Sequence, residues 1–110
     1  MSNLEVAEAM IAHYNAQDVD AYVALMTEDA AEATYRGAVL RDGREGVRTG
    51  LAATFAEFPE NRAEIIERKV LGDHVVFLER VWRTAAGEPF DVLAIYSFAG
   101  GKCSRVEFVR

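Results

Sequence analysis

The chain has 110 residues, of which 51% are hydrophobic and 27% charged, and its formal net charge is −6. This length allows one hydrophobic core, so residues 1–110 are expected to form a single domain. The acidic balance argues against nucleic acid and anionic membranes as partners, because both select basic surfaces. Since no leader-like or membrane-length apolar run is present, the cytoplasm is the expected location.

The residue inventory offers no metal or cofactor site. Cys103 is the only cysteine, which excludes an intrachain disulfide and suits a small buried hydrophobe. The two histidines, His13 and His74, are far apart and provide no paired ligands at metal spacing. No glycine-rich phosphate loop follows a predicted strand. We therefore expect neither a metal ion nor a cofactor.

Two helices are predicted at the start of the chain. Ser2 and Glu5 have the spacing of a capping box, and apolar residues then recur at helical intervals to about residue 16. Asp18 can cap a second helix whose apolar face runs from Val19 to Met26. The short connection between them predicts a helical hairpin.

A short strand and a third helix should follow. Residues 30–36 alternate in polarity, which predicts a strand, and residues 37–43 are expected to form a loop. Asp42 and Glu45 have the spacing of a second capping box. The helix that begins there should end before Pro59, because proline cannot continue a helix.

The second half of the chain is predicted to be a meander of four strands. β-Branched and aromatic residues are concentrated in four runs, residues 62–71, 75–82, 89–98 and 104–110. Gly72 and Asp73, between the first two runs, suit a type II′ hairpin turn. This order of elements predicts an α+β fold in which three N-terminal helices pack on one face of a curved antiparallel sheet.

Both faces of this sheet are predicted to be covered. Positions of either parity between Phe90 and Phe98 are apolar, so neither face is suited to water. The helices can cover one face, which leaves the other for a second copy of the chain. We expect an isologous homodimer through the outer sheet face, with a contact that includes Leu93, Ile95, Phe77 and Val75.

Three segments of the chain resemble one known superfamily. YNAQDVD at residues 14–20, ALMTEDA at residues 24–30 and YSFAGGK at residues 96–102 are similar to segments of nuclear-transport-factor-2-like proteins. The similarity is greatest to the SnoaL-like and ketosteroid-isomerase-like branch and covers nearly the whole chain. It implies a conical half-barrel that encloses an apolar pocket. Members of this branch range from isomerases, cyclases and epoxide hydrolases to non-catalytic binding modules, so the fold does not settle the function.

The resemblance does not carry over the known catalytic groups. Against ketosteroid isomerase, the two oxyanion donors fall at Met10 and Ala94 and the general base falls at Thr34, and none of these can perform that chemistry. Against limonene-type epoxide hydrolases, Arg80 matches an arginine, but the two aspartates fall at Trp82 and Phe108. The catalytic residues are therefore unknown, and Arg80 is the best candidate.

The family placement and strand alternation together predict a pocket wall. The predicted ligand-binding residues are Met10, Tyr14, Thr34, Phe55, Leu78, Arg80, Trp82, Val92, Ala94, Tyr96 and Phe108. Arg80 is expected either to hold the polar end of a ligand or to pair with an acidic residue such as Glu32. Tyr14 and Tyr96 could be core residues with locally bonded hydroxyls. Glu32 could act as a base if it turned inward, although the sequence favours a solvated carboxylate.

Two functions remain open from the sequence. The first is a cofactor-independent isomerase, cyclase or hydrolase that acts on a small apolar carbonyl or cyclic compound. The second is a non-catalytic module for small-molecule binding or dimerisation, which the missing catalytic carboxylates favour. A buried carboxylate or histidine with a shifted pKa at the pocket would distinguish them, because proton transfer needs such a group.

Overall fold

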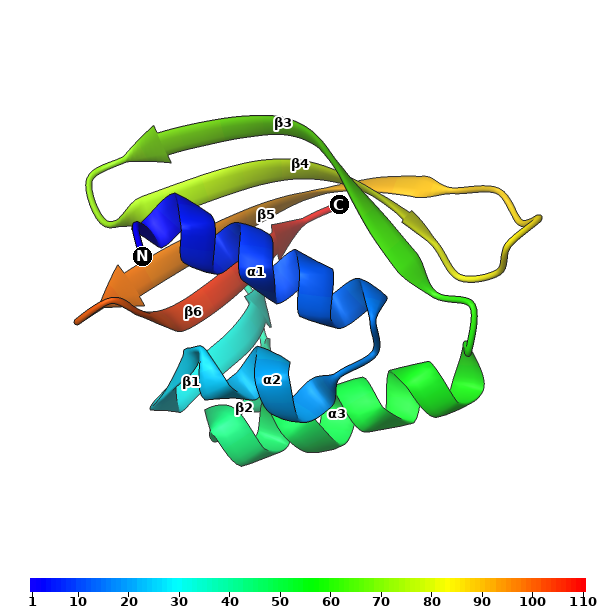
Figure 1. Cartoon of the computed structure of the whole chain (residues 1–110), viewed down its shortest axis with the longest axis horizontal. Coiled ribbons are helices and arrows are strands. Elements are labelled where there is room, and N and C mark those ends of the chain that lie inside the picture. The colour runs from blue at the N-terminus through cyan, green and yellow to red at the C-terminus, as the bar shows by residue number, and fades with distance from the viewer.

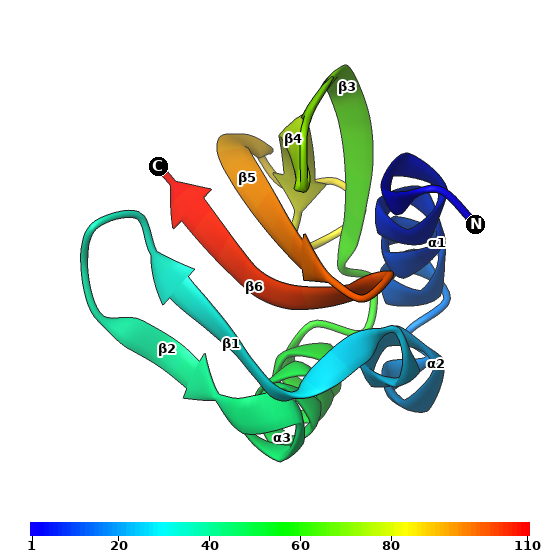
Figure 2. The ribbon, with the colours of Figure 1, turned by 90° about the vertical axis from the view of Figure 1, so that its left-hand side faces the viewer.

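A strongly curved sheet of six strands encloses a space that three helices cover (Figures 1 and 2). The computed structural model describes all 110 residues. The elements in chain order are α1 (Asn3–Asn15), α2 (Val19–Ala24), β1 (Met26–Thr34), β2 (Val39–Asp42), α3 (Gly43–Glu57), β3 (Arg62–Leu71), β4 (His74–Trp82), β5 (Phe90–Ala99) and β6 (Lys102–Val109). The predicted α+β class is confirmed. None of the helices has the length and hydrophobicity needed to cross a membrane.

The sheet is mixed, whereas the sequence predicted an antiparallel one. Its strand order is β2-β1-β6-β5-β4-β3, in which β1 runs parallel to β6 and every other pair is antiparallel. The chain reaches this arrangement because β1 returns from the helical hairpin to the free edge of the last strand. The sheet stays open, with β2 at one edge and β3 at the other.

The first two helices form as predicted. The Ser2 hydroxyl accepts a hydrogen bond from the Glu5 backbone N–H at 3.1 Å, and the Glu5 carboxylate accepts one from the Ser2 N–H at 2.9 Å. This capping box satisfies backbone donors that have no partner within the helix. Asp18 caps α2 by accepting from the Ala21 N–H at 3.1 Å. Helix α2 ends at Ala24. Met26, which the sequence placed on this helix, is instead the first residue of β1.

The region between α2 and α3 differs most from the prediction. The strand expected at residues 30–36 is the later part of a longer strand, and the loop expected at 37–43 contains β2. On this edge strand, Val39 and Leu40 are 49% and 58% exposed. The sequence pattern misses β2 because buried and exposed residues do not alternate along it. Asp42 precedes α3 but makes no side-chain capping bond.

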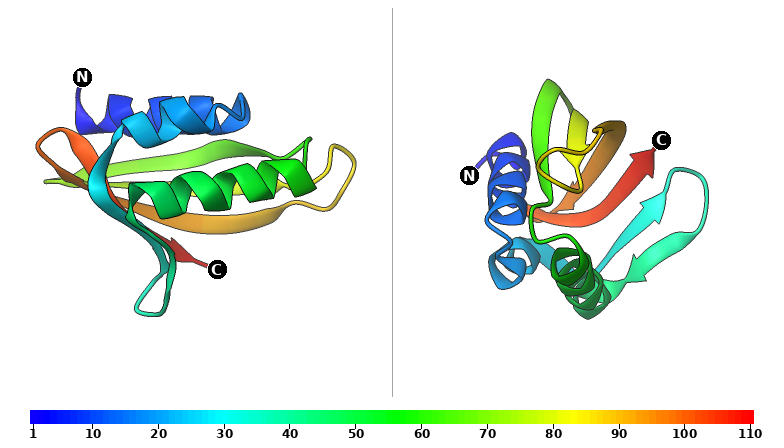
Figure 3. Two further views of the ribbon diagram at one scale, coloured as in Figure 1. Left: turned by 90° about the horizontal axis from the view of Figure 1, so that it is seen from below. Right: turned by 90° about the vertical axis from the view of Figure 1, so that its right-hand side faces the viewer.

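The meander from β3 to β6 is confirmed, with turns of the expected chemistry. Gly72 has a φ of 59° while Asp73 keeps a negative φ, the combination that a type II′ turn requires. Gly100 and Gly101 have φ values of 58° and 81°, a backbone conformation that favours glycine at both central positions of the last hairpin. Helix α1 packs on β3, β4 and β6, and α3 packs on β1 and β2 (Figure 3).

The register of β4 against β5 determines which side chains face the helices. Phe77 lies opposite Ala94, and Leu78 lies opposite Leu93. Directly paired residues point to the same face of a sheet, and Phe77 and Ala94 are both fully buried. The inner face of these strands therefore holds Val75, Phe77, Glu79, Val81, Val92, Ala94, Tyr96 and Phe98.

Two sequence predictions about this face were wrong. Leu78, Arg80 and Trp82 lie on the outer face and not on the pocket wall, because they share the parity of Leu93 and not of Ala94. For the same reason Val75 and Phe77, expected in an outer contact, lie buried beneath the helices. The outer face of β4 instead presents Val76, Leu78, Arg80 and Trp82, all partly exposed.

Truncating Phe77 should test this assignment of faces. Phe77 packs edge-on against the Tyr96 ring, with centroids 5.2 Å apart. Phe77→Ala should lower the free energy of unfolding by about 3–5 kcal/mol, through lost burial and the cavity left behind. Leu78→Ala, on the outer face, should cost about 1 kcal/mol because its side chain is only partly buried. Urea denaturation of both variants measures this, and equal losses would contradict the assigned register.

Candidate functional site

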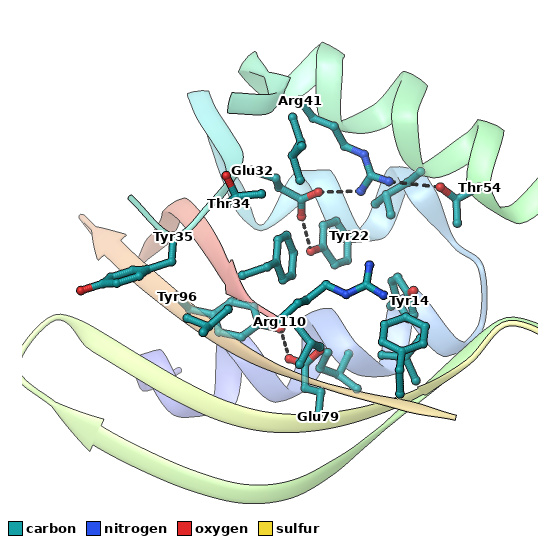
Figure 4. A pocket seen from close by; sticks show the side chains of 18 of the residues that line it. Tyr14, Tyr22, Glu32, Thr34, Tyr35, Arg41, Thr54, Glu79, Tyr96 and Arg110 are labelled. Carbon is teal, nitrogen blue, oxygen red and sulfur yellow. Dashed lines mark hydrogen bonds and ion pairs between the residues drawn. The ribbon is translucent and has the colours of Figure 1, made fainter. Parts of the chain in front are cut away.

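A cavity of about 720 Å³ lies between the helices and the inner face of the sheet (Figure 4). Twelve of its 19 lining residues are hydrophobic, so most of the wall suits an apolar compound. Polar groups interrupt this wall at eleven positions, four of which are tyrosines already counted among the hydrophobic residues. They belong to Tyr14, Tyr22, Glu32, Thr34, Tyr35, Arg41, Thr54, Glu79, Arg83, Tyr96 and Arg110.

Glu79 is a buried carboxylate on the floor formed by β4 and β5. Its residue is 4% exposed, and its Oε2 accepts a hydrogen bond from the Tyr96 hydroxyl at 2.6 Å. Every buried polar side-chain atom of the protein has a hydrogen-bond partner. The other Glu79 oxygen has no partner in the protein, so it is not enclosed and is open to the cavity. Figure 4 shows this carboxylate beside the Tyr96 hydroxyl.

Burial sets the protonation of this carboxylate. The pKa of Glu79 is raised from 4.5 to about 7, mainly because burial removes the carboxylate from water. The Tyr96 hydrogen bond opposes this rise, and the nearby charge of Glu32 adds to it. Burial also raises the pKa of Tyr96 well above its ordinary value, so its hydroxyl stays a neutral donor. Near neutral pH Glu79 can therefore both accept and donate a proton.

A second buried carboxylate, Glu32, lies on β1 in a different environment. It is 1% exposed, and both of its oxygens accept hydrogen bonds, from the Tyr22 hydroxyl at 2.9 Å and from Arg41 Nη1 at 2.7 Å. Arg41 comes from β2, and its other terminal nitrogen donates to the Thr54 hydroxyl at 3.1 Å. The ion pair compensates the charge that burial would otherwise make costly.

Gly50 on α3 makes room for this arginine. A Cβ at position 50 would collide with the Arg41 side chain, which crosses the helix surface there to reach Glu32. The small residue thus lets a cation from an edge strand reach a carboxylate inside the cavity. Figure 4 shows the guanidinium between Glu32 and Thr54.

A cluster of three polar side chains, Tyr14, Asn61 and Arg83, joins α1 to the ends of β3 and β4. The Asn61 side-chain nitrogen donates to the Tyr14 hydroxyl oxygen at 2.6 Å, and Arg83 Nη1 donates to the Asn61 side-chain oxygen, Oδ1, at 2.7 Å. Asn61 is 2% exposed, so these bonds satisfy both ends of a buried amide. The hydroxyl hydrogen of Tyr14 has no acceptor in the protein. Because Tyr14 lines the cavity, that hydrogen is free to bond to a ligand.

The structure brings together only some of the residues predicted to bind ligand. Tyr14, Thr34, Val92, Tyr96 and Phe108 line the cavity, and their role in binding stays a prediction. Three others do not line it, since Met10, Phe55 and Ala94 are buried in the core. Phe55 lies behind the wall, with its ring edge-on to Tyr14 at 5.2 Å.

Arg80, the best candidate from the sequence, lies outside the cavity. Its guanidinium donates two hydrogen bonds to the Asp91 carboxylate, at 2.9 and 3.2 Å, on the outer face. The ion pair raises the pKa of Arg80 and lowers that of Asp91. The predicted pairing with Glu32 was also wrong, since Glu32 pairs with Arg41.

Sequence reasoning missed Glu79 and favoured the wrong environment for Glu32. The sequence favours a solvated Glu32, but the side chain is buried, because Arg41 on the unpredicted strand β2 compensates its charge. Glu79 is not among the residues that the sequence predicts to bind ligand, although its neighbour Arg80 is. One signal in the sequence could have identified Glu79. Val75, Phe77 and Val81 lie on the same face of the strand as this residue, and that face is otherwise apolar. A lone carboxylate in such a face is a candidate for a shifted pKa.

The arrangement is suited to proton transfer in an apolar space. It combines a carboxyl group that titrates near neutrality with a free tyrosine hydroxyl, two kinds of group used in general acid–base catalysis. No group of three or more His, Cys, Asp or Glu side chains is placed to hold a metal ion.

The solved structures include close relatives of this fold. An uncharacterised cystatin-fold protein from Novosphingobium aromaticivorans is 59% identical, with a TM-score of 0.95 over 100% of this chain and 99% of that one. A candidate polyketide cyclase from Sinorhizobium meliloti is 19% identical, with a TM-score of 0.82 over 99% and 100% of the two chains. A ketosteroid-isomerase-like protein from Catenulispora acidiphila, solved with trimethylamine, is 22% identical, with a TM-score of 0.79 over 96% and 85%.

Comparison with curated protein sequences identifies no relative. The model of the SnoaL-like domain family matches residues 7–106, which is most of the chain. The match agrees with the open, conical sheet and with the resemblance seen in the sequence. The chain therefore belongs to the SnoaL-like domain family.

Proposed function

We propose that this SnoaL-like protein is a cofactor-independent acid–base enzyme that acts on a small, largely apolar carbonyl or cyclic compound. One observation supports this proposal above the others. Glu79 is buried on the cavity wall, has one oxygen open to the cavity, and has a pKa raised to about 7. A general base is most effective when its pKa lies near the working pH. The cavity thus has the kind of group that proton transfer needs, which supports catalysis over simple binding.

Three polar groups of the cavity have a role in the proposed reaction. Ionised Glu79 removes a proton from a carbon next to the substrate carbonyl and returns it to another atom of the same compound. The Tyr96 hydroxyl holds the Glu79 carboxylate in place through its 2.6 Å hydrogen bond. The free hydroxyl hydrogen of Tyr14 bonds to the carbonyl oxygen, where negative charge develops in the transition state.

A non-catalytic binding role is the second candidate, and it too has an observation in its favour. The positions that match the catalytic groups of ketosteroid isomerase hold Met10, Thr34 and Ala94, and two of these are buried in the core. The protein therefore lacks the groups for steroid isomerisation at those positions. Under this alternative, Glu79 and Tyr96 would form a structural hydrogen bond, and the cavity would hold a ligand without changing it.

A homodimer in the cytoplasm is the proposed form of the protein. Its support is the outer sheet face, where Val76 and Leu78 of β4 lie opposite Ile95 and Leu93 of β5, all partly exposed. An apolar face of this kind is typical of a protein–protein contact. The ion pair of Arg80 with Asp91 lies on the same face and would be part of the contact.

Proton exchange tests the catalytic role. The wild type is incubated in heavy water with a panel of small apolar ketones, and loss of their α-protons is followed by NMR. Glu79→Gln should slow the exchange of any accepted ketone by roughly 10²- to 10⁴-fold, the usual contribution of a general base. Glu67→Gln, an exposed carboxylate on β3, is the matched control and should retain the wild-type rate. A wild type that binds a ketone without exchanging its protons would contradict the proposal and support the binding role.

The stability of the protein should depend on pH through the same residue. Below pH 4.5 Glu79 is protonated in both the folded and the unfolded chain, so it makes no difference to stability. Between pH 4.5 and about 7 only the unfolded chain loses this proton, so the folded state loses stability as the pH rises. Above that range the accumulated loss should be about 3 kcal/mol.

Glu79→Gln should remove this loss while keeping an acceptor for Tyr96. The variant should therefore become more stable relative to wild type as the pH rises from 4.5 to about 7. Urea denaturation at several pH values measures the difference. Glu67→Gln should follow the wild-type profile. Parallel profiles for wild type and Glu79→Gln would show that burial does not raise the pKa of Glu79.

Sedimentation velocity tests the homodimer. The wild type should sediment as a dimer at micromolar concentration, and Ile95→Asp should dissociate it, because a charge would be buried without a partner in the contact. Val70→Asp, on an exposed part of β3, is the matched control and should remain dimeric. A stable, monodisperse wild-type monomer would rule out this arrangement.

A further inference from the structure

Two arginines meet at one end of the cavity. Arg83 directly follows β4, Arg110 directly follows β6, and Phe90 begins β5 between them in the sheet. The Arg83 guanidinium lies 5.2 Å from the centre of the Phe90 ring, and that of Arg110 lies 4.2 Å from it. All three residues line the cavity. The ends of three neighbouring strands therefore place two positive charges against one aromatic ring, and Figure 4 shows Arg110 among the lining side chains.

Neither arginine has an acidic partner. Arg83 and Arg110 take part in none of the ion pairs of the protein, although the chain has 18 acidic residues and only 12 basic ones. The third arginine of the cavity, Arg41, is neutralised by Glu32. Of the cations that lack an ion pair, only Arg83 and Arg110 line the cavity. Their charges are thus left for something that enters it.

Arg83 is held in position by a neutral group. Its Nη1 donates to the Asn61 carbonyl at 2.7 Å, and Asn61 is itself buried and bonded to Tyr14. The guanidinium also lies 5.6 Å from the centre of the Phe58 ring. This single bond to the protein leaves most N–H donors of a guanidinium unused. A cation that is oriented by an amide and aromatic rings keeps its full charge for an anion.

We propose that Arg83 and Arg110 form an anion subsite that holds the carboxylate of a small, mainly apolar acid. The apolar body of such a compound would lie along Phe90, Val92 and Phe108, which line the wall beside this end. Guanidinium groups bind carboxylates through strong, charge-assisted hydrogen bonds. The inference deepens the proposed function by naming the substrate class as carbonyl or cyclic compounds that carry a carboxylate. Only the expectation that such a compound is converted rests on the proposed function, and the binding of its carboxylate does not.

Calorimetry with a matched pair of probes tests the subsite. Naphthoate carries the carboxylate, and naphthamide is its neutral analogue of nearly the same shape. Titrations are run at about pH 6, where an aromatic carboxylic acid is ionised and Glu79 is mostly protonated. The wild type should bind naphthoate at least about tenfold more tightly than naphthamide. Added salt should weaken the binding of naphthoate and leave that of naphthamide unchanged.

Four variants locate the source of this preference. Arg110→Gln and Arg83→Gln should each reduce it severalfold, and the double variant should abolish it. Arg44→Gln removes the same charge from α3 outside the cavity and should keep the wild-type preference. If Arg83→Gln fails to fold because Asn61 loses its partner, Arg110→Gln still carries the test, since the Arg110 side chain contacts the Phe90 ring and is part of no ion pair.

The outcomes separate this subsite from the proposed catalysis. Equal affinities for the two probes, or no binding of either at millimolar concentration, would overturn the subsite. An unchanged preference in the double variant would also overturn it. Exchange of ketone protons without any preference for carboxylates would leave the proposed function in place. A preference that depends on the two arginines, in a protein that exchanges no protons, would support the subsite and overturn the catalysis.

Discussion

The burial of carboxylates in an apolar cavity is the constraint on which the chemistry of this protein depends. Removing a carboxylate from water disfavours its charged form unless a cation or several donors replace the water. Glu32 has such a replacement in Arg41 and Tyr22. Glu79 has only the hydroxyl of Tyr96 and also feels the charge of Glu32, so its pKa rises to about 7. One cavity thus contains a carboxylate whose charge is compensated by an arginine, and a carboxyl group that can gain or lose a proton near neutral pH.

The curvature of the sheet makes this cavity possible. Helix α1 packs on β3, β4 and β6, while α3 packs on β1 and β2 at the other side of the curve. The parallel pairing of β1 with β6 connects these two regions and brings Glu32 to the cavity that Glu79 lines. The side chains of the core cluster fill the closed part of the cone, including Met10, Phe77 and Tyr96. The open part remains as the cavity.

The secondary structure was largely predictable from the sequence, whereas the site was not. Capping residues and glycine turns act locally, so they predicted the first two helices and the four-strand meander correctly, whereas Asp42 precedes α3 without a capping bond. The face of β4 was harder, because Val76, Leu78 and Trp82 are as apolar as Val75, Phe77 and Val81. The pairing of Phe77 with Ala94 shows which residues share a face, and the packing of the helices on that face buries them. Glu32 was hidden for a related reason, since its burial depends on Arg41 from a strand that has no alternating pattern.

Two charged side chains of the cavity form no ion pair and are held by uncharged hydrogen-bond partners instead. Tyr96 orients Glu79, and Asn61 orients Arg83. Had these two charges been paired with each other, the arginine would have lowered the pKa of the carboxylate and removed its ability to exchange a proton near neutral pH. An ion pair would also have used the donors that an anion needs. Holding each charge with an uncharged hydrogen-bond partner costs stability, but it keeps a base and a cation available in one apolar space. Such an arrangement is expected of a binding or catalytic site and has no advantage in a core that serves only folding.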